Sequence, residues 1–115
     1  MPFVTLTTNL SSEKVDKAFS ESFSEKLAET LGKPIERISV TVVAGQQMCR
    51  GGSWDPLCEV HVLAIGLDSA EKTQKPAEEI TKFLSDRTGI QPARICLTFR
   101  PVLPHQVSVN GALMG

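Results

Sequence analysis

Four short segments alternate apolar and polar side chains and are rich in β-branched residues, a pattern typical of half-buried strands. They cover residues 3–8, 37–43, 59–65 and 94–99. The clearest is Arg37-Ile38-Ser39-Val40-Thr41-Val42-Val43, in which hydroxyl-bearing and aliphatic residues alternate. The sequence therefore predicts four strands, each with one face toward a core.

A longer segment between the first two strands repeats apolar residues at the spacing of an amphipathic helix. Ser11 or Ser12 is a candidate N-cap, Gly32 supplies a left-handed C-cap, and Pro34 prevents continuation of the helix. The predicted core face consists of Val15, Ala18, Phe19, Phe23, Leu27, Ala28 and Leu31. The pattern predicts one helix here.

A second helix is predicted between the third and fourth strands. Asp68 or Ser69 can cap it, and it continues to Thr88, where Gly89 stops it. Pro76 lies inside this stretch. Because proline removes a backbone donor, we expect the helix either to be kinked or to begin a few residues late.

The remaining segments lack a regular pattern. Residues 45–56 contain Gly51-Gly52-Ser53 and the only tryptophan, Trp54, and predict a long irregular connection. A phosphate loop is not expected here because the G-x-x-x-x-G-K pattern is absent and no helix follows directly. After Pro101 and Pro104 comes an irregular tail with short apolar pieces at 107–109 and 112–114.

The two halves of the chain match when Leu6 is placed on Leu63. The same shift places Ser12 on Ser69, Phe23 on Ile80, Leu27 on Leu84, Gly32 on Gly89 and Arg37 on Arg94. The match indicates pseudo-repeats at about 2–57 and 58–115 within a single domain, 1–115. Two βαβ units predict an α/β (α+β) fold, with one four-stranded sheet and both helices on the same face.

That arrangement leaves the other face of the sheet without helices. Depending on strand phase, it presents either the apolar alternates or the polar set Thr5, Thr7, Ser39, Thr41, Cys96 and Thr98. Either set is unusual as a bare surface. We therefore expect a symmetric oligomer that packs these faces inward, with the tail adding edge strands between subunits.

Composition excludes several classes of function. Twelve basic and thirteen acidic residues give a net charge of −1, so binding to nucleic acid or to an anionic membrane is not expected. No apolar run is long enough to insert into a membrane, and the start of the chain lacks the pattern of a secretory signal. We expect synthesis in the cytoplasm. Cys49, Cys58 and Cys96 lack C-x-x-C spacing and are predicted to be buried, reduced thiols.

The start of the chain carries the strongest candidate chemistry. Met1 precedes the small residue Pro2, so we expect Met1 to be removed and Pro2 to carry a free secondary amine. An apolar environment disfavours the charged form of an amine and lowers its pKa below the usual amino-terminal value of about 8. Phe3, Val4 and Leu6 would bury it. Such an amine is a candidate general base or nucleophile.

Three motifs carry a resemblance to a known family. They are the opening Pro2-Phe3-Val4-x-Leu6-x-Thr8-Asn9-Leu10, the turn Leu31-Gly32-Lys33-Pro34-x-x-Arg37-Ile38, and Ile65-Gly66 before a helix. The chain resembles the macrophage migration inhibitory factor family along its whole length, and within it the D-dopachrome tautomerase branch. The resemblance implies a duplicated βαβ sheet assembled as a homotrimer, with active sites between subunits.

The resemblance also implies keto-enol tautomerisation without a cofactor. Pro2 would be the catalytic base on a small-molecule α-keto acid or dopachrome-type substrate, with decarboxylation possible for D-dopachrome. Lys33 would bind the substrate carboxylate, the backbone N–H of Ile65 would contact the substrate, and Thr98 of a neighbouring subunit would close the pocket. Arg37 could be a second cationic contact or, like Arg94 at the equivalent repeat position, a structural turn residue.

The histidines suggest no further site. His61 and His105 have no spacing that indicates a triad or a metal site, so no metal is expected.

Some positions depart from the family pattern. Thr98 stands where the family usually has Asn, Cys96 replaces an aromatic residue, and Ala64 replaces a common Ser. The tail offers Val102, Val107, Val109 and Met114 where aromatic residues often wall the pocket. Leu57 and Val60 occupy the positions of the C-x-x-C cysteines, so thiol-disulfide oxidoreductase activity is not expected.

A second function stays open. Family members leave the cell without a signal peptide and bind the invariant-chain receptor, so the resemblance also implies a cytokine-like secreted ligand whose catalysis is weak or vestigial. A plain trimeric scaffold is favoured if Met1 is retained, because the Pro2 nitrogen is then a tertiary amide without a basic lone pair.

Overall fold

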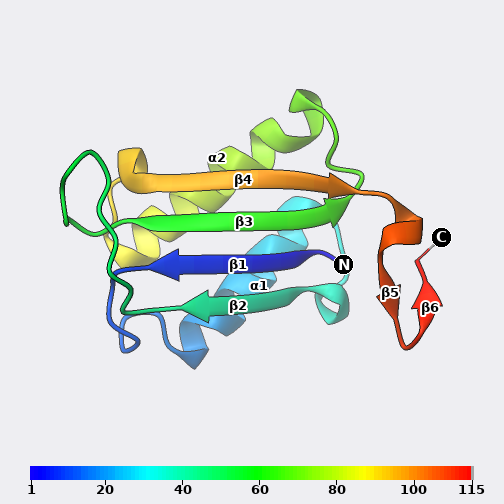
Figure 1. Ribbon diagram of the computed structural model, residues 1–115, viewed down its shortest axis with the longest axis horizontal. Coiled ribbons are helices and arrows are strands. Elements are labelled where there is room, and N and C mark those ends of the chain that lie inside the picture. Colours follow the sequence, from blue (N-terminus) through cyan, green and yellow to red (C-terminus); the bar gives the residue numbers. More distant parts are fainter. Residues whose placement is uncertain (115) are drawn as a thin grey trace.

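The computed structural model describes residues 1–114, and its centre is a four-stranded sheet. The strands are β1 (Phe3–Thr8), β2 (Ser39–Val43), β3 (Cys58–Ile65) and β4 (Ile95–Val102), in the order β2-β1-β3-β4 (Figure 1). β1 is parallel to β2, β3 is parallel to β4, and the two pairs meet antiparallel between β1 and β3. Each parallel pair is therefore one βαβ unit.

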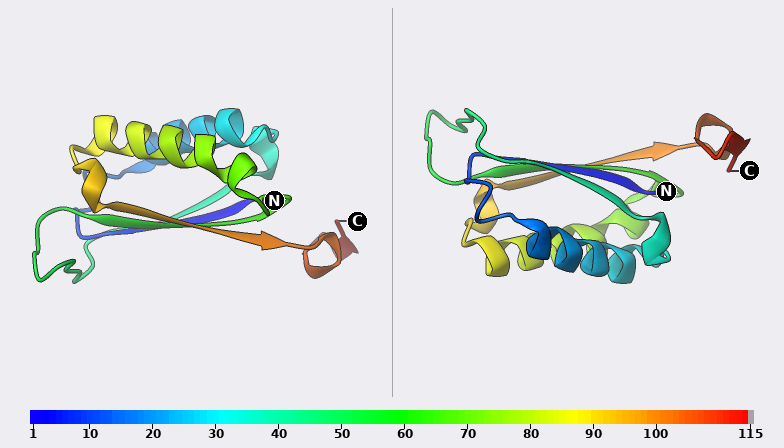
Figure 2. Two further views of the ribbon diagram at one scale, coloured as in Figure 1. Left: turned by 90° about the horizontal axis from the view of Figure 1, so that it is seen from above. Right: turned by 90° about the horizontal axis from the view of Figure 1, so that it is seen from below.

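Both helices cover one face of this sheet (Figure 2). They are α1 (Lys17–Leu31) and α2 (Ala70–Thr88). The predicted fold, a duplicated βαβ sheet with two helices on the same side, is confirmed. No helix within residues 1–114 is long and apolar enough to cross a membrane.

The start of α1 differs from the prediction. The N-cap is Asp16, whose carboxylate accepts a 3.0 Å hydrogen bond from the backbone N–H of Phe19. Residues 12–15 form a turn instead, in which Val15 is buried. The prediction of Ser11 or Ser12 as N-cap was wrong because this buried turn residue continues the apolar spacing of the helix. The C-cap Gly32 is left-handed, with φ of 64°, as predicted.

Pro76 lies inside α2, which begins at Ala70 after Ser69. A late start of the helix is therefore excluded. Pro76 is buried and has no backbone N–H, so the carbonyl of Lys72 lacks its usual intrahelical donor.

Two strands begin later than their alternation suggested. Short 3-10 turns, η1 (Ile35–Arg37) and η2 (Pro92–Arg94), precede β2 and β4. Arg37 therefore ends a turn and does not open the strand. The backbone groups of these residues form local hydrogen bonds within the turns. The spacing of apolar residues does not reveal such turns. β4 also continues beyond Phe99 to Val102, where an edge strand tolerates proline.

The core lies between the helices and the inner face of the sheet. It contains apolar residues of all the main elements, including Val4, Leu6, Phe23, Leu27, Val60, Val62, Ile80 and Leu84. The rings of Phe23 and Phe83 stack where α1 meets α2, with their centroids 5.8 Å apart. Val4 and Leu6 are buried against the helices, so the alternate residues of β1, Thr5 and Thr7, face the open side of the sheet.

The tail forms a hairpin beyond the end of the sheet, close to the N-terminus (Figure 1). A 3-10 turn, η3 (Pro104–Gln106), leads into β5 (Ser108–Val109), which pairs antiparallel with β6 (Ala112–Leu113). Within residues 1–114 these strands pair with each other. Edge pairing with another subunit stays a prediction.

The cysteines are free thiols with different environments. Cys58 is buried and Cys96 is half-buried, but Cys49 is exposed. The prediction of burial was therefore wrong for Cys49. It lies in the connection 45–56, where no regular element covers it.

Candidate active site

The N-terminus is fixed at the end of the sheet where β3 and β4 finish (Figure 1). The terminal amine of Met1 donates a 2.8 Å hydrogen bond to the carbonyl of Arg37, and the N–H of Ser39 donates to the carbonyl of Pro2 at 3.1 Å. Met1 is 7% exposed, and Pro2 is fully buried. The parallel pairing of β1 with β2 thus holds the start of the chain in place.

A pocket of about 350 Å³ opens beside this terminus. Its walls come from the chain start, the turn before β2 and the tail, and consist of Met1, Phe3, Glu36, Arg37, Ser39, Val109 and Met114. Three distant parts of the sequence therefore meet around the N-terminal nitrogen.

The pocket disfavours a positive charge on that nitrogen. Burial, followed by the positive charges of Arg37 and Lys33, lowers the pKa of the Met1 amine from its usual value. These are the two side chains that were predicted from the sequence as cationic contacts to the substrate. Their electrostatic effect on the amine indicates that both lie near the chain start.

Lys33 owes its position to the end of α1. It follows the C-cap Gly32, and its backbone N–H donates to the carbonyl of Ala28 at 3.1 Å. Lys33 is half-buried. Within residues 1–114, neither Lys33 nor Arg37 forms an ion pair, so both charges remain available to an anionic ligand.

Ile65 lies at the same end of the sheet. Phe3 pairs with Leu63, and continuing this antiparallel register leads Ile65, the last residue of β3, toward the chain start. Thr98 is elsewhere: it pairs with His61, two strands away from β1. One subunit therefore gathers Pro2, Lys33, Arg37 and Ile65, but not Thr98.

Thr98 lines a separate hollow of about 390 Å³ on the open face of the sheet. The other lining residues are Phe3, Thr5, His61, Leu63 and Arg100. Phe3 borders both this hollow and the N-terminal pocket. The role predicted for Thr98, in the pocket of a neighbouring subunit, is not tested by a single chain.

The protein-family model described as "Macrophage migration inhibitory factor (MIF)" matches residues 1–115. The chain belongs to the macrophage migration inhibitory factor family. It is 37% identical over 115 residues to the Xenopus laevis protein named D-dopachrome decarboxylase-B, with 99% of this chain and 98% of the relative covered. It is 35% identical over 111 residues to MIF-like protein mif-2 of Caenorhabditis elegans, at coverages of 96% and 92%.

Solved structures agree with this assignment. The macrophage migration inhibitory factor of Oncomelania hupensis superimposes with a TM-score of 0.93 at 25% identity, covering 100% of this chain and 83% of that chain. The factor of Trichinella spiralis gives 0.90 at 25% identity, with coverages of 96% and 98%. The family predicted from the sequence motifs is confirmed.

Sequence reasoning missed two pocket residues of this family member. Glu36 and Ser39 line the pocket on either side of Arg37 and Ile38. Pro34 could have pointed to them, because it prevents the helix from continuing and begins the turn that brings the next residues to the chain start. The alternation of the following strand concealed that turn.

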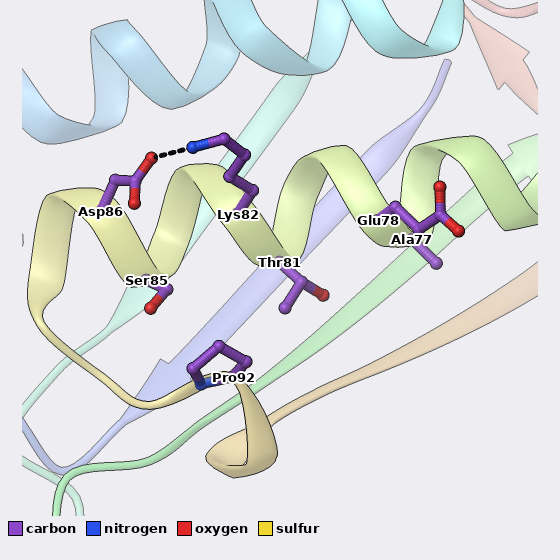
Figure 3. A pocket seen from close by; sticks show the side chains of 7 residues that line it. All are labelled: Ala77, Glu78, Thr81, Lys82, Ser85, Asp86 and Pro92. Carbon is purple, nitrogen blue, oxygen red and sulfur yellow. Dashed lines mark hydrogen bonds and ion pairs between the residues drawn. The ribbon is translucent and has the colours of Figure 1, made fainter.

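A larger hollow lies away from the N-terminus, on the flank of α2 (Figure 3). It measures about 480 Å³ and is lined by Ala77, Glu78, Thr81, Lys82, Ser85, Asp86 and Pro92. Lys82 and Asp86 form an ion pair at 2.9 Å and so neutralise each other. Size alone therefore does not identify the site, because this hollow does not contain the N-terminal amine or the unpaired cations Lys33 and Arg37.

Other reactive groups are poor candidates. Burial, then Cys96 and Glu59, raises the pKa of the Cys58 thiol to about 12, so this cysteine stays protonated. Within residues 1–114, no three His, Cys, Asp or Glu side chains lie close enough together to hold a metal ion. The N-terminal pocket remains the candidate active site.

Proposed function

We propose that the protein is a keto-enol tautomerase in which Pro2, freed by removal of Met1, is the general base. The observation that carries the proposal is the lowered pKa of the Met1 amine, one residue before Pro2, beside a pocket that Arg37 lines. Lys33 also lowers this pKa, and neither cation forms an ion pair within residues 1–114. A base whose pKa lies near ambient pH is the most effective one for transferring a proton to and from carbon.

The reaction requires one proton to move from carbon to oxygen. The neutral Pro2 nitrogen takes a proton from the carbon next to the substrate carbonyl. The electron pair of that C–H bond forms the carbon-carbon double bond, and the π pair of the carbonyl moves to its oxygen. The protonated proline then returns the proton to this oxygen, which gives the enol. Ketonisation is the reverse. Proton and electrons balance without a cofactor.

The cations bind and orient the substrate. Lys33 and Arg37 attract the carboxylate of an α-keto acid. The same charges lower the pKa of the Met1 amine, and we expect them to act in the same direction on Pro2 once Met1 is removed. The backbone N–H of Ile65 donates to the substrate, and Thr98 of the partner subunit closes the pocket in a homotrimer. The open face of the sheet, with its hollow beside Phe3, supports such an assembly.

The proposed substrates are α-keto acids and dopachrome-type rings. Relatives named D-dopachrome decarboxylase support the second class. In that case, withdrawal of electrons into the ring stabilises the charge left by the departing carboxylate. The tail contributes Val109 and Met114 to the pocket, so the aromatic ring among its lining residues comes from Phe3 at the chain start.

The test combines intact mass with stopped-flow assays of phenylpyruvate and D-dopachrome methyl ester, comparing wild type with Pro2→Gly. We expect wild type to lack Met1 and to turn over at least one substrate, and the variant to lose about 100-fold or more, as expected for removal of a general base. Inactivity of the Met1-free protein on both substrates would contradict the proposal, as would full activity of the variant.

A second candidate is a cytokine-like ligand. It is supported by relatives named macrophage migration inhibitory factor homologue, and by the exposed side chain of Trp54 on a well-braced loop. A pull-down with the invariant-chain receptor ectodomain tests it. Binding that survives Pro2→Gly would separate this function from catalysis, and absence of binding by wild type would exclude it.

A further inference from the structure

The tail hairpin turns on the dipeptide Asn110-Gly111. Asn110 has φ of 55° and Gly111 φ of 77°, which identifies a type I′ turn between two paired strands. Asn110 is the only non-glycine residue within residues 1–114 with a positive φ, and both turn residues are exposed. Space around Gly111 is open, since an added Cβ would meet no atom within 4 Å.

We propose that Asn110 is a site of spontaneous deamidation, and that the isoaspartate formed there opens the hairpin that walls the N-terminal pocket. The backbone nitrogen of Gly111, which no side chain shields, is the nucleophile. The hairpin is held by only two residue pairs, and so short a hairpin samples open conformations in which this nitrogen reaches the Asn110 side chain.

The chemistry balances without a cofactor or oxidant. The Gly111 nitrogen loses its proton and attacks Cγ of Asn110, a C–N bond forms, and the side-chain amide leaves as ammonia. Water then opens the five-membered succinimide at one of its two carbonyls. Opening at Cγ gives aspartate, and opening at the backbone carbonyl carbon gives isoaspartate, in which the chain runs through Cβ and Cγ.

The chain contains one other asparagine, Asn9, which serves as an internal control. Its side-chain nitrogen donates to the carbonyls of Trp54 and Asp55 at 3.0 and 3.2 Å, and its oxygen accepts from the N–H of Leu57 at 3.0 Å. Leu10 follows it. Within residues 1–114, no hydrogen bond holds the Asn110 side chain, so only Asn110 is free to react.

The hairpin connects this turn to the pocket. Val109 and Met114 line the pocket, and the N–H of Met114 donates to the carbonyl of Val107 at 3.0 Å. Isoaspartate adds one main-chain atom to a two-residue turn, so Val109 and Ala112 can no longer pair. Aspartate keeps the turn, because Asp-Gly also suits type I′ geometry.

The modification and the opening of the hairpin do not depend on catalysis, whereas an effect on turnover rests on the proposed function. The experiment therefore incubates the full chain at mildly alkaline pH and follows three readouts over time. These are peptide mapping that separates Asn, Asp and isoAsp, hydrogen exchange at the Met114 amide, and tautomerase activity.

The matched control is Asn110→Gly. Gly-Gly also suits a type I′ turn but has no side-chain amide to lose, so this variant keeps the hairpin and cannot deamidate. Asn110→Asp carries the new charge with a normal main chain and separates the effect of charge from that of the inserted atom.

We expect Asn110 to deamidate about tenfold faster than Asn9 or more, because Asn9 must first break its hydrogen bonds. Exchange at Met114 should accelerate in step with isoaspartate, while fresh Asn110→Gly and Asn110→Asp remain protected. Equal rates at the two asparagines, or unchanged exchange in the isoaspartate form, would overturn the proposal. If the hairpin opens but fresh protein has no activity, only the proposed function fails.

Discussion

Arg37 and Arg94 occupy equivalent positions in the two repeats but have different environments. Each is the last residue of a three-residue 3-10 turn that leads into a strand. Arg94 donates four hydrogen bonds to carbonyls of the connection 45–56, at 2.9 to 3.3 Å. The Arg37 side chain forms no hydrogen bond within residues 1–114 and lines the pocket.

The difference arises from what lies opposite each turn. The connection 45–56 passes beside Arg94, and its carbonyls require donors. At the other end of the sheet the chain start lies beside the Arg37 turn, and the Arg37 carbonyl already accepts the Met1 amine. The duplicated fold therefore supplies two arginines, of which one fixes a loop and the other lines the pocket without a hydrogen-bond partner among residues 1–114.

Replacing Arg37 should have the largest effect, and the effect should be on activity. Arg37→Met is expected to lower kcat/KM for an α-keto acid by about tenfold to a hundredfold, the value of a hydrogen bond to a charged group. Steady-state kinetics measures it, and the loss should appear mainly in KM. The free energy of unfolding should change by less than about 0.5 kcal/mol. If the Arg37→Met variant were destabilised but fully active, Arg37 would be a structural residue and not a substrate contact.

Replacing Arg94 should affect stability instead. Arg94→Met leaves four loop carbonyls without their donor, and we expect a loss of about 1–2 kcal/mol, limited because most of these bonds are exposed. Urea titration at fixed protein concentration measures it. Arg94→Lys should recover part of the loss. Turnover per folded subunit should be unchanged, and a specific loss of activity would count against a structural role.

The pH dependence of kcat/KM should also distinguish Arg37 from Arg94. Arg37 and Lys33 lower the pKa of the N-terminal amine, so removing either charge raises it. The rise of kcat/KM with pH, which follows deprotonation of the base, should then move to higher pH in Arg37→Met and less far in Lys33→Met. Arg94→Met should leave the profile in place. A shift in Arg94→Met alone would contradict the comparison.

The smallest expected effect concerns thiol reactivity near the loop that Arg94 holds. Iodoacetamide should modify the exposed Cys49 in the native protein but not Cys58, whose pKa is raised to about 12. Because Cys58 belongs to β3, Arg94→Met should leave it protected. Mass spectrometry of the labelled peptides checks this, and native labelling of Cys58 in the variant would show that Arg94 also stabilises the sheet.

The sequence predicted the duplicated sheet because Gly32 and Gly89 end equivalent helices and β-branched strands follow each. It could not separate Arg37 from Arg94, since both turns have the same local pattern and the partners are distant in sequence. It also missed Glu36, because a 3-10 turn has no distinct apolar period, and Ser39, which it assigned only to the polar alternates of the sheet. Thr98 depends on a neighbouring subunit, and its predicted role stays a prediction.

The central claim is that the chain start holds an amine with a lowered pKa. NMR titration of isotope-labelled Pro2 in the Met1-free protein measures that pKa directly. We predict a value below the usual amino-terminal value of about 8, and an upward shift when Arg37 is replaced by Met. A value at or above the usual one, insensitive to Arg37, would contradict the account.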